Sequence, residues 1–117
     1  IRPFMVIGGS SRDFLGEYMA GGVILVLGLN LREWESHKAK FVGTGMHGGV
    51  IYMRGKITDL GKDVEVIDVD ESDVQLIQSL VKEFCSYFSF DFDEIMSKKF
   101  TKIVPISNRP YWRLYAY

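Results

Sequence analysis

Residues 43–55 read GTGMHGGVIYMRG, and the same pattern occurs 27 positions earlier as GEYMAGGVILVLG at residues 16–28. Seven of the 13 aligned positions are identical, and four of those seven are glycine. Each copy contains a glycine-bounded turn, a methionine, a Gly-Gly pair, a run of strand-forming residues and a closing glycine. Repeats with a period of tens of residues are typical of stacked structural units.

Glycine accepts positive φ and close backbone approach more readily than any other residue. Val, Ile, Leu and Tyr between the glycines favour strands. We therefore expect a mainly β fold, a short β-helix (solenoid) in which each coil buries its face on the next one. The predicted structural corners are Gly16, Gly21, Gly22, Gly28, Gly43, Gly45, Gly48, Gly49 and Gly55.

Residues 43–48 also satisfy G-x-G-x-x-G, the fingerprint of dinucleotide-binding proteins. That fingerprint requires the third glycine to open a helix, whose N-terminal amides receive the pyrophosphate. Here residues 50–53 are strand formers, and the distance between the two copies leaves no room for a βαβ crossover. We therefore interpret the glycines as turns between strands.

The composition is that of an ordinary soluble domain. The chain has 117 residues, 47% of them hydrophobic and 25% charged, and a net charge of −1. This charge gives no reason to expect nucleic acid or an anionic membrane as a partner, and no apolar run approaches the ~20 residues that span a bilayer. The single cysteine, Cys85, excludes an internal disulfide and suits a cytoplasmic location.

All 12 glycines lie between residues 8 and 61. We predict a Gly-rich β-helix module over residues 1–69, and a helical cap with a basic aromatic tail over residues 70–117, in one compact domain. Residues 59–94 carry eleven acidic and two basic side chains, whereas residues 95–117 carry five basic side chains and no acidic one.

Several elements can be predicted outside the repeat. Residues 4–7 and 64–69 read as strands, residues 56–60 as the start of another coil, and residues 29–40 as a solvated loop. A capping box with Ser72 as N-cap and Gln75 as its partner, or Asp70 as the alternative cap, predicts a helix to about residue 86. A second, short helix is expected from residue 91 to about 99. Residues 101–106 look extended, and Pro105 predicts an edge or unpaired segment.

His47 is the strongest candidate for chemistry, because it lies in a glycine-rich corner where the first copy has Ala20. It is either a base or ligand donor, or a histidine held by backbone carbonyls, and no second metal ligand follows at the usual spacing. His37 lies in a polar loop and is predicted to be solvated. Asp13 and Glu17 form either an acid–base pair or two caps of turn amides.

No other pattern indicates catalysis. Ser10 and Ser11 have no nucleophile elbow around them, and Met19 and Met46 are expected to fill the core. No nucleophile, base and oxyanion site come together. The sequence therefore predicts no catalytic, cofactor-binding or metal-binding residues, and a chain that is not an enzyme on its own.

The C-terminal tail mixes arginine with aromatic residues, a combination that is enriched at protein interfaces and that can also stack single-stranded nucleic acid. We favour the protein interface because the whole chain is slightly acidic. The predicted interface combines this tail with the first strand. Its residues are Met5, Tyr111, Trp112, Arg113 and Tyr115.

Both glycine-rich copies, with DFLGEYMAGG at residues 13–22 and GTGMHGGVIYMRG at residues 43–55, resemble the C-terminal domain of the glutamate synthase large subunit. The likeness covers residues 8–61 and, more loosely, the following helix and residues 108–111. The same glycine pattern is similar to the β-helical part of formylmethanofuran dehydrogenase. The family region is usually longer, with more coils before residue 1, and residues 29–40 match no family motif.

The resemblance implies a right-handed β-helix that packs against amidotransferase and flavin-binding parts and holds neither nucleophile, FMN nor cluster ligands. We therefore expect a structural or assembly subunit of a glutamate synthase-like oxidoreductase in glutamate biosynthesis. Its expected partners are the amidotransferase and FMN/iron–sulfur proteins, or further copies of the chain. The alternatives are the β-helix of a formylmethanofuran dehydrogenase-type complex, or a small ligand-binding module around His47.

Overall fold

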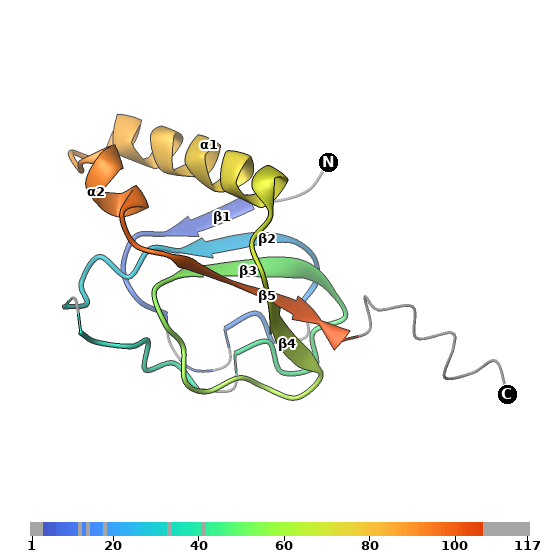
Figure 1. Cartoon of the computed structure of the whole chain (residues 1–117). Coiled ribbons are helices and arrows are strands. Elements are labelled where there is room, and N and C mark those ends of the chain that lie inside the picture. The colour runs from blue at the N-terminus through green and yellow to red at the C-terminus, as the bar shows by residue number, and fades with distance from the viewer. Residues whose placement is uncertain are drawn as a thin grey trace, which may run out of the picture.

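The computed structural model describes residues 4–11, 13, 15–17, 19–32, 34–40 and 42–106. These residues form one mixed sheet with the strand order β1-β2-β3-β5-β4, and two helices (Figure 1). The elements are β1 (Phe4–Ile7), β2 (Ala20–Val26), β3 (Gly48–Arg54), β4 (Val64–Ile67), α1 (Glu71–Tyr87), α2 (Phe92–Met96) and β5 (Phe100–Pro105). The prediction of a mainly β fold is confirmed.

The first three strands are parallel and connect the copies of the repeat. Phe4 of β1 lies opposite Val23 of β2, and Val23 lies opposite Val50 of β3. The second pairing joins residues 27 positions apart, so equivalent positions of the two copies are neighbours in the sheet. The glycine-rich repeat is therefore a unit of structure.

The segments that return from one strand to the next also stack on each other. His37 pairs with Ile57 and Val42 with Leu60 in isolated parallel bridges. The Gly43 N–H donates to the carbonyl of Leu15 at 2.6 Å. Successive turns of the chain are therefore joined by hydrogen bonds on two sides, on the sheet and on the returning segments.

Two apolar clusters pack on the two faces of the sheet. One lies between the sheet and the returning segments, and the other between the sheet and α1. The first contains Val26, Ala39, Val42, Met46, Ile51, Met53, Val64 and Ile103. The second contains Val23, Leu25, Leu27, Tyr52, Ile77, Leu80, Val81 and Ile95. Strand β2 contributes to both clusters because its side chains alternate between the faces.

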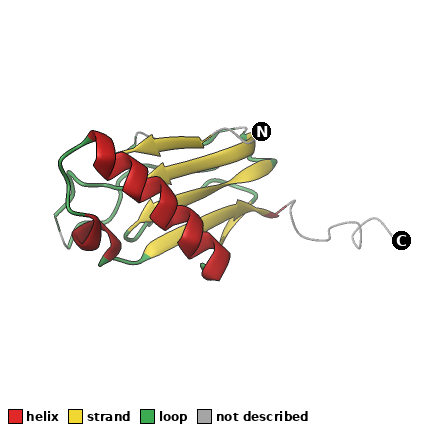
Figure 2. Ribbon diagram, turned by 90° about the horizontal axis from the view of Figure 1, so that it is seen from above, coloured by secondary structure: helices red, strands yellow, loops and turns green. Residues whose placement is uncertain are grey.

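Helix α1 covers a face of the sheet and not an end of the stack. Figure 2 shows it running diagonally over the strands. Its Ile77 and Val81 are buried against Val23 and Leu25 of β2. The expectation that the helical segment caps the end of a solenoid is therefore wrong. The apolar stripe of the helix finds more partner surface on the alternating side chains of β2 and β3 than on a single terminal coil.

Strand β5 was expected at an edge, and this expectation is wrong. It lies between β3 and β4 and is antiparallel to both. Pro105 is compatible with this position because it is the last residue of the strand, opposite Val64. A missing N–H at the end of a strand interrupts no continuing ladder, and the next N–H, of Ile106, donates to Asp63 at 2.7 Å.

The N-cap of α1 is Asp70 and its partner in the capping box is Asp73. The Ser72 and Gln75 box is therefore wrong, and the alternative cap is the one used. A carboxylate accepts backbone N–H bonds more strongly than a hydroxyl, and Ser72 instead donates its hydroxyl to Asp70 at 3.2 Å. The helix ends at Tyr87, close to the expected end, whereas α2 ends at Met96 instead of near residue 99.

Candidate functional site

The glycines of the repeat divide into two kinds. Gly22 and Gly49 are equivalent and have φ of 85° and 83°. Gly21 and Gly48 lack a positive φ: a Cβ on Gly48 would lie 2.3 Å from the carbonyl oxygen of Ala20, whereas a Cβ on Gly21 would meet nothing within 4 Å. Positive φ is also found at Gly16, Gly28, Gly43, Gly45 and Gly55.

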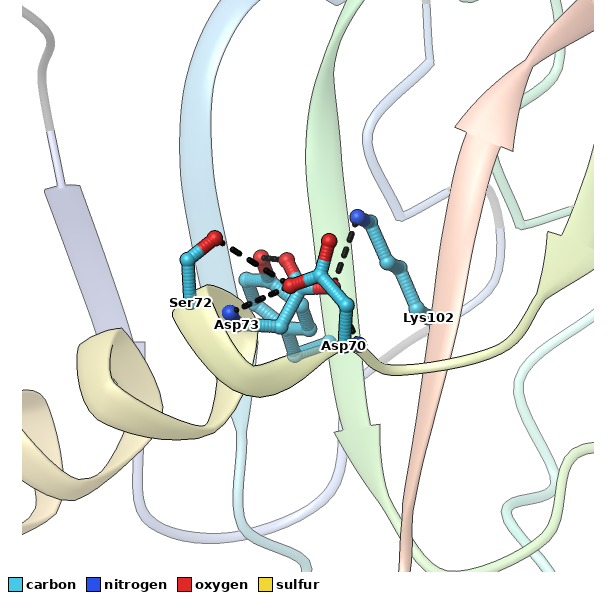
Figure 3. A network of polar contacts seen from close by, with 5 residues as sticks. Asp70, Ser72, Asp73 and Lys102 are labelled. Atoms are coloured by element: carbon cyan, nitrogen blue, oxygen red, sulfur yellow. Dashed lines mark hydrogen bonds and ion pairs between the residues drawn. The ribbon is translucent and has the colours of Figure 1, made fainter.

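A hollow of about 470 Å³ lies over the Gly-Gly pairs, at the start of α1. Asp73 stands at its centre and is 6% exposed. Its carboxylate accepts hydrogen bonds from the Tyr52 hydroxyl, from Lys102 at 2.8 Å and from the Asp70 N–H at 2.9 Å. Figure 3 shows Lys102 of β5 reaching across to the first turn of the helix. This cluster, Tyr52–Asp73–Lys102, ties α1 to β3 and β5.

The chemistry of this cluster follows from the state of Asp73. Burial alone would raise the pKa of Asp73, but the bonds from Lys102, Tyr52 and the Asp70 N–H outweigh it and lower the pKa to about 2. A carboxylate that is ionised at neutral pH and already accepts three hydrogen bonds is a poor proton donor and has little free basicity. The arrangement therefore suits holding elements together better than acid–base catalysis.

His37 is the residue that the sequence interpretation missed. It was predicted to be solvated, and this is wrong, because the side chain is 1% exposed. Its Nε2 lies 2.7 Å from the carbonyl oxygen of Arg54 and donates to it, while Nδ1 is buried without a hydrogen-bond partner in the described part of the chain. A Cβ on Gly28 would lie 2.8 Å from the ring, so the glycine leaves room for it.

Lowering the pH is expected to destabilise the protein through His37. Burial lowers its pKa below 6.5, the nearby Lys98 and Arg54 lower it further, and the bond to Arg54 opposes this. Because the folded pKa is the lower one, His37 contributes full stability above pH ~6.5, and the contribution falls as the pH drops below that value. We expect thermal unfolding to show a larger loss between pH 7.5 and 5.5 for the parent than for His37→Gln. His47→Gln is the control and should keep the parent's loss.

The other candidates do not come together. His47 is exposed, and its backbone N–H donates to Met19 at 2.7 Å. Asp13 accepts from the Lys40 N–H at 2.8 Å, a bond between neighbouring coils that fits the capping interpretation. Met46 is buried in the core. Within the described residues, no group of three or more His, Cys, Asp or Glu side chains is placed to hold a metal ion.

The predicted interface is only partly described. Met5 lies on the edge strand β1 and is 56% exposed. Tyr111, Trp112, Arg113 and Tyr115 lie outside the described residues. Among the helices of the described residues, none has the length and apolarity needed to cross a bilayer.

Comparison with known proteins agrees with the family resemblance. Residues 2–106 match the GXGXG motif family, the family of the glutamate synthase C-terminal domain. "Uncharacterized protein MJ1350" of Methanocaldococcus jannaschii is 43% identical over 121 residues, which cover 97% of this chain and 46% of that protein. The chain thus spans less than half of that relative, and no solved structure matches. Because the family match extends over nearly the whole chain, the protein belongs to the GXGXG motif family.

Proposed function

We propose that the chain is a non-catalytic assembly module of a glutamate synthase-type oxidoreductase, and that it binds its partner by adding a strand to β1. The partner is a polypeptide that carries the amidotransferase or the FMN/iron–sulfur chemistry of glutamate biosynthesis. The observation that carries the proposal is the contrast between the two edges of the sheet.

The edge strand β1 has no feature that would prevent pairing. Its sequence, FMVI, is uncharged, and Phe4 and Met5 are 51% and 56% exposed. It has a sheet neighbour on one side only among the described strands. The other edge, β4, contains Glu65 and is flanked by Asp63 and Asp68. Charges on an edge strand discourage pairing, so β1 is the edge that suits a partner.

The stacked turns support a short right-handed β-helix as the form of this module. Sheet pairing and the bonds between returning segments repeat along the same direction. In such a stack each turn contacts only its neighbours, so a terminal turn presents a surface that fits one more turn. A strand added to β1 in parallel would continue the arrangement that already joins β1 to β2.

The state of the polar groups supports a role without catalysis. The one buried carboxylate among the described side chains, Asp73, is occupied by three donors. Cys85, the single cysteine of the chain, cannot alone hold an iron–sulfur cluster. Flavin and cluster chemistry would then reside in the partner.

A single charge on β1 should weaken partner binding. We expect Met5→Lys to reduce co-purification with the amidotransferase and synthase polypeptides by at least about tenfold, because it places a charge against an apolar strand edge. Val66→Lys is the matched control, since Val66 is 50% exposed on the opposite edge strand. Circular dichroism checks that both variants remain folded.

Equal binding by Met5→Lys and the parent would show that β1 is not the contact. Stoichiometric FMN on the isolated chain, or glutaminase activity of the isolated chain, would contradict the non-catalytic role itself.

A further inference from the structure

The turn between β2 and β3 is longer than its neighbour, and the additional residues form an exposed loop. Paired residues of β1 and β2 are 19 positions apart, whereas those of β2 and β3 are 27 apart. The chain leaves the stack after Gly28 and rejoins it at His37, whose N–H donates to Lys56 at 2.9 Å. In repeat proteins, insertions of this kind map to one face, which is often the binding face.

The inserted loop presents a tryptophan. Trp34 is 77% exposed, and the guanidinium of Arg32 lies 5.5 Å from the centre of its ring. The loop is held by the buried His37 and by a turn in which the Glu35 N–H donates to Arg32 at 2.9 Å. An exposed tryptophan in a fixed loop is a costly arrangement in water, and Trp and Arg are the residues that dominate binding energy at protein interfaces.

A second group of exposed aromatic residues follows the end of α1. Tyr87, Phe88 and Phe90 are 76%, 55% and 49% exposed. The ring of Phe84 lies 4.8 Å from that of Phe88 and 5.7 Å from that of Phe90, centre to centre. These contacts place the rings as a ridge between α1 and α2.

The loop and the ridge belong to one surface. A hollow of about 500 Å³ lies between them, with Leu29 and Leu31 on one side and Phe90 and Ile95 on the other. Figure 1 shows the loop after β2, the end of α1 and α2 at the same end of the sheet. We name this surface the aromatic end. It consists of Leu29, Leu31, Trp34, Tyr87, Phe88 and Phe90.

Charges of both signs border the aromatic end, and they are separated. The three carboxylates come from α2 or its N-cap, while the three cations come from the loop, from β3 and from the segment after α2. Within the described residues, none of the six takes part in an ion pair. The carboxylates are Asp91, Asp93 and Glu94, and the cations are Arg32, Arg54 and Lys98.

We propose that two copies of the chain associate through the aromatic end around a two-fold axis. In such a contact the same patch is used by both copies, so it must be complementary to itself. A patch with one sign of charge would repel its copy, whereas here the cations of one copy face the carboxylates of the other. The aromatic rings supply the apolar centre and the charges fix the orientation. This contact is separate from β1 and does not depend on the proposed function.

The first test is self-association of the full chain by sedimentation over a concentration series. We expect a monomer–dimer equilibrium that Trp34→Glu weakens by at least about tenfold, as for a central interface residue. Val66→Glu, on the exposed edge strand β4, is the matched control and should associate like the parent. A parent that stays monomeric, or a Trp34→Glu variant that associates normally, would overturn the proposal and leave the aromatic end to a different polypeptide.

The second test uses charge reversal. Lys98→Glu and Glu94→Lys should each lose self-association, because each homodimer then brings like charges together. An equimolar mixture should regain association as a heterodimer, since the opposite signs meet again across the axis. A mixture that stays monomeric while both variants are folded would exclude the two-fold arrangement.

The third test follows Trp34 directly. In a Trp112→Phe background Trp34 is the single tryptophan, because the chain has two. Its fluorescence should shift to the blue with rising concentration, and an emission that does not change while dimers form would place the contact elsewhere. Met5→Lys should leave this shift unchanged, which separates the contact from that at β1.

Discussion

Replacing Gly49 with valine is expected to lower the free energy of unfolding by about 2–5 kcal/mol. Two effects combine. A β-branched residue at φ 83° is strained by about 1–3 kcal/mol, and overpacking adds a similar amount. A Cβ at this position would lie 2.8 Å from the carbonyl oxygen of Gly22 and 2.7 Å from the Met19 methyl group. The backbone contact cannot relax by a side-chain rotation. Urea unfolding followed by circular dichroism measures the change.

Gly21→Ala is the control for this prediction. It changes a glycine of the same repeat that has no positive φ and no atom within 4 Å of a new Cβ. Its effect should stay within about 0.5 kcal/mol, as for ordinary surface changes. Gly22→Val should lose about 1–3 kcal/mol from backbone strain. A Gly49→Val variant as stable as the parent would refute the argument from the corners.

Removing the carboxylate of Asp73 is expected to have the second large effect. Asp73→Ala should cost about 3–5 kcal/mol, because it leaves the ammonium of Lys102 in a partly buried place without its counterion. It also removes the capping box of α1. The double variant Asp73→Ala/Lys102→Met should recover part of the loss, since no uncompensated charge remains.

The pH dependence of the parent gives a separate measurement on this cluster. The pKa of Asp73 is about 2 in the folded chain and near 3.8 without these contacts. Since the folded pKa is the lower one, the stabilisation is present above pH ~4 and is lost as the pH falls towards 2. Asp73→Asn should lack this part of the acid sensitivity. Equal slopes for Asp73→Asn and the parent in this range would contradict the ion pair.

The repeat and the helix could be predicted because their signals are local. The 27-residue offset in the sequence is the offset of the strand register between β2 and β3. The apolar positions of α1 follow the helical period, and Ile77 and Val81 are buried as that period requires. Such patterns depend on the backbone geometry of a single element and therefore survive without knowledge of the partner.

The errors arose where a distant segment decides the outcome. His37 is in a polar stretch, but the stacking of its backbone on Ile57 draws the ring under Gly28. Strand β5 contains a proline, yet its place in the sheet is set by pairing with β3 and β4, which are far away in sequence. The Tyr52–Asp73–Lys102 cluster joins three elements, and no spacing in the sequence connects them.

The antiparallel strand β5 gives the stack a direction of growth. By pairing with β3, it occupies the side on which a further parallel turn would have to attach. Duplication of the 27-residue unit could therefore lengthen this protein on the β1 side alone, while the β3 side is closed by β5 and the edge strand β4. Evolution would add turns at one end, like courses on a wall whose other end is already finished. Relatives of different length are then expected to differ before β1 and to share the arrangement from β3 to β5.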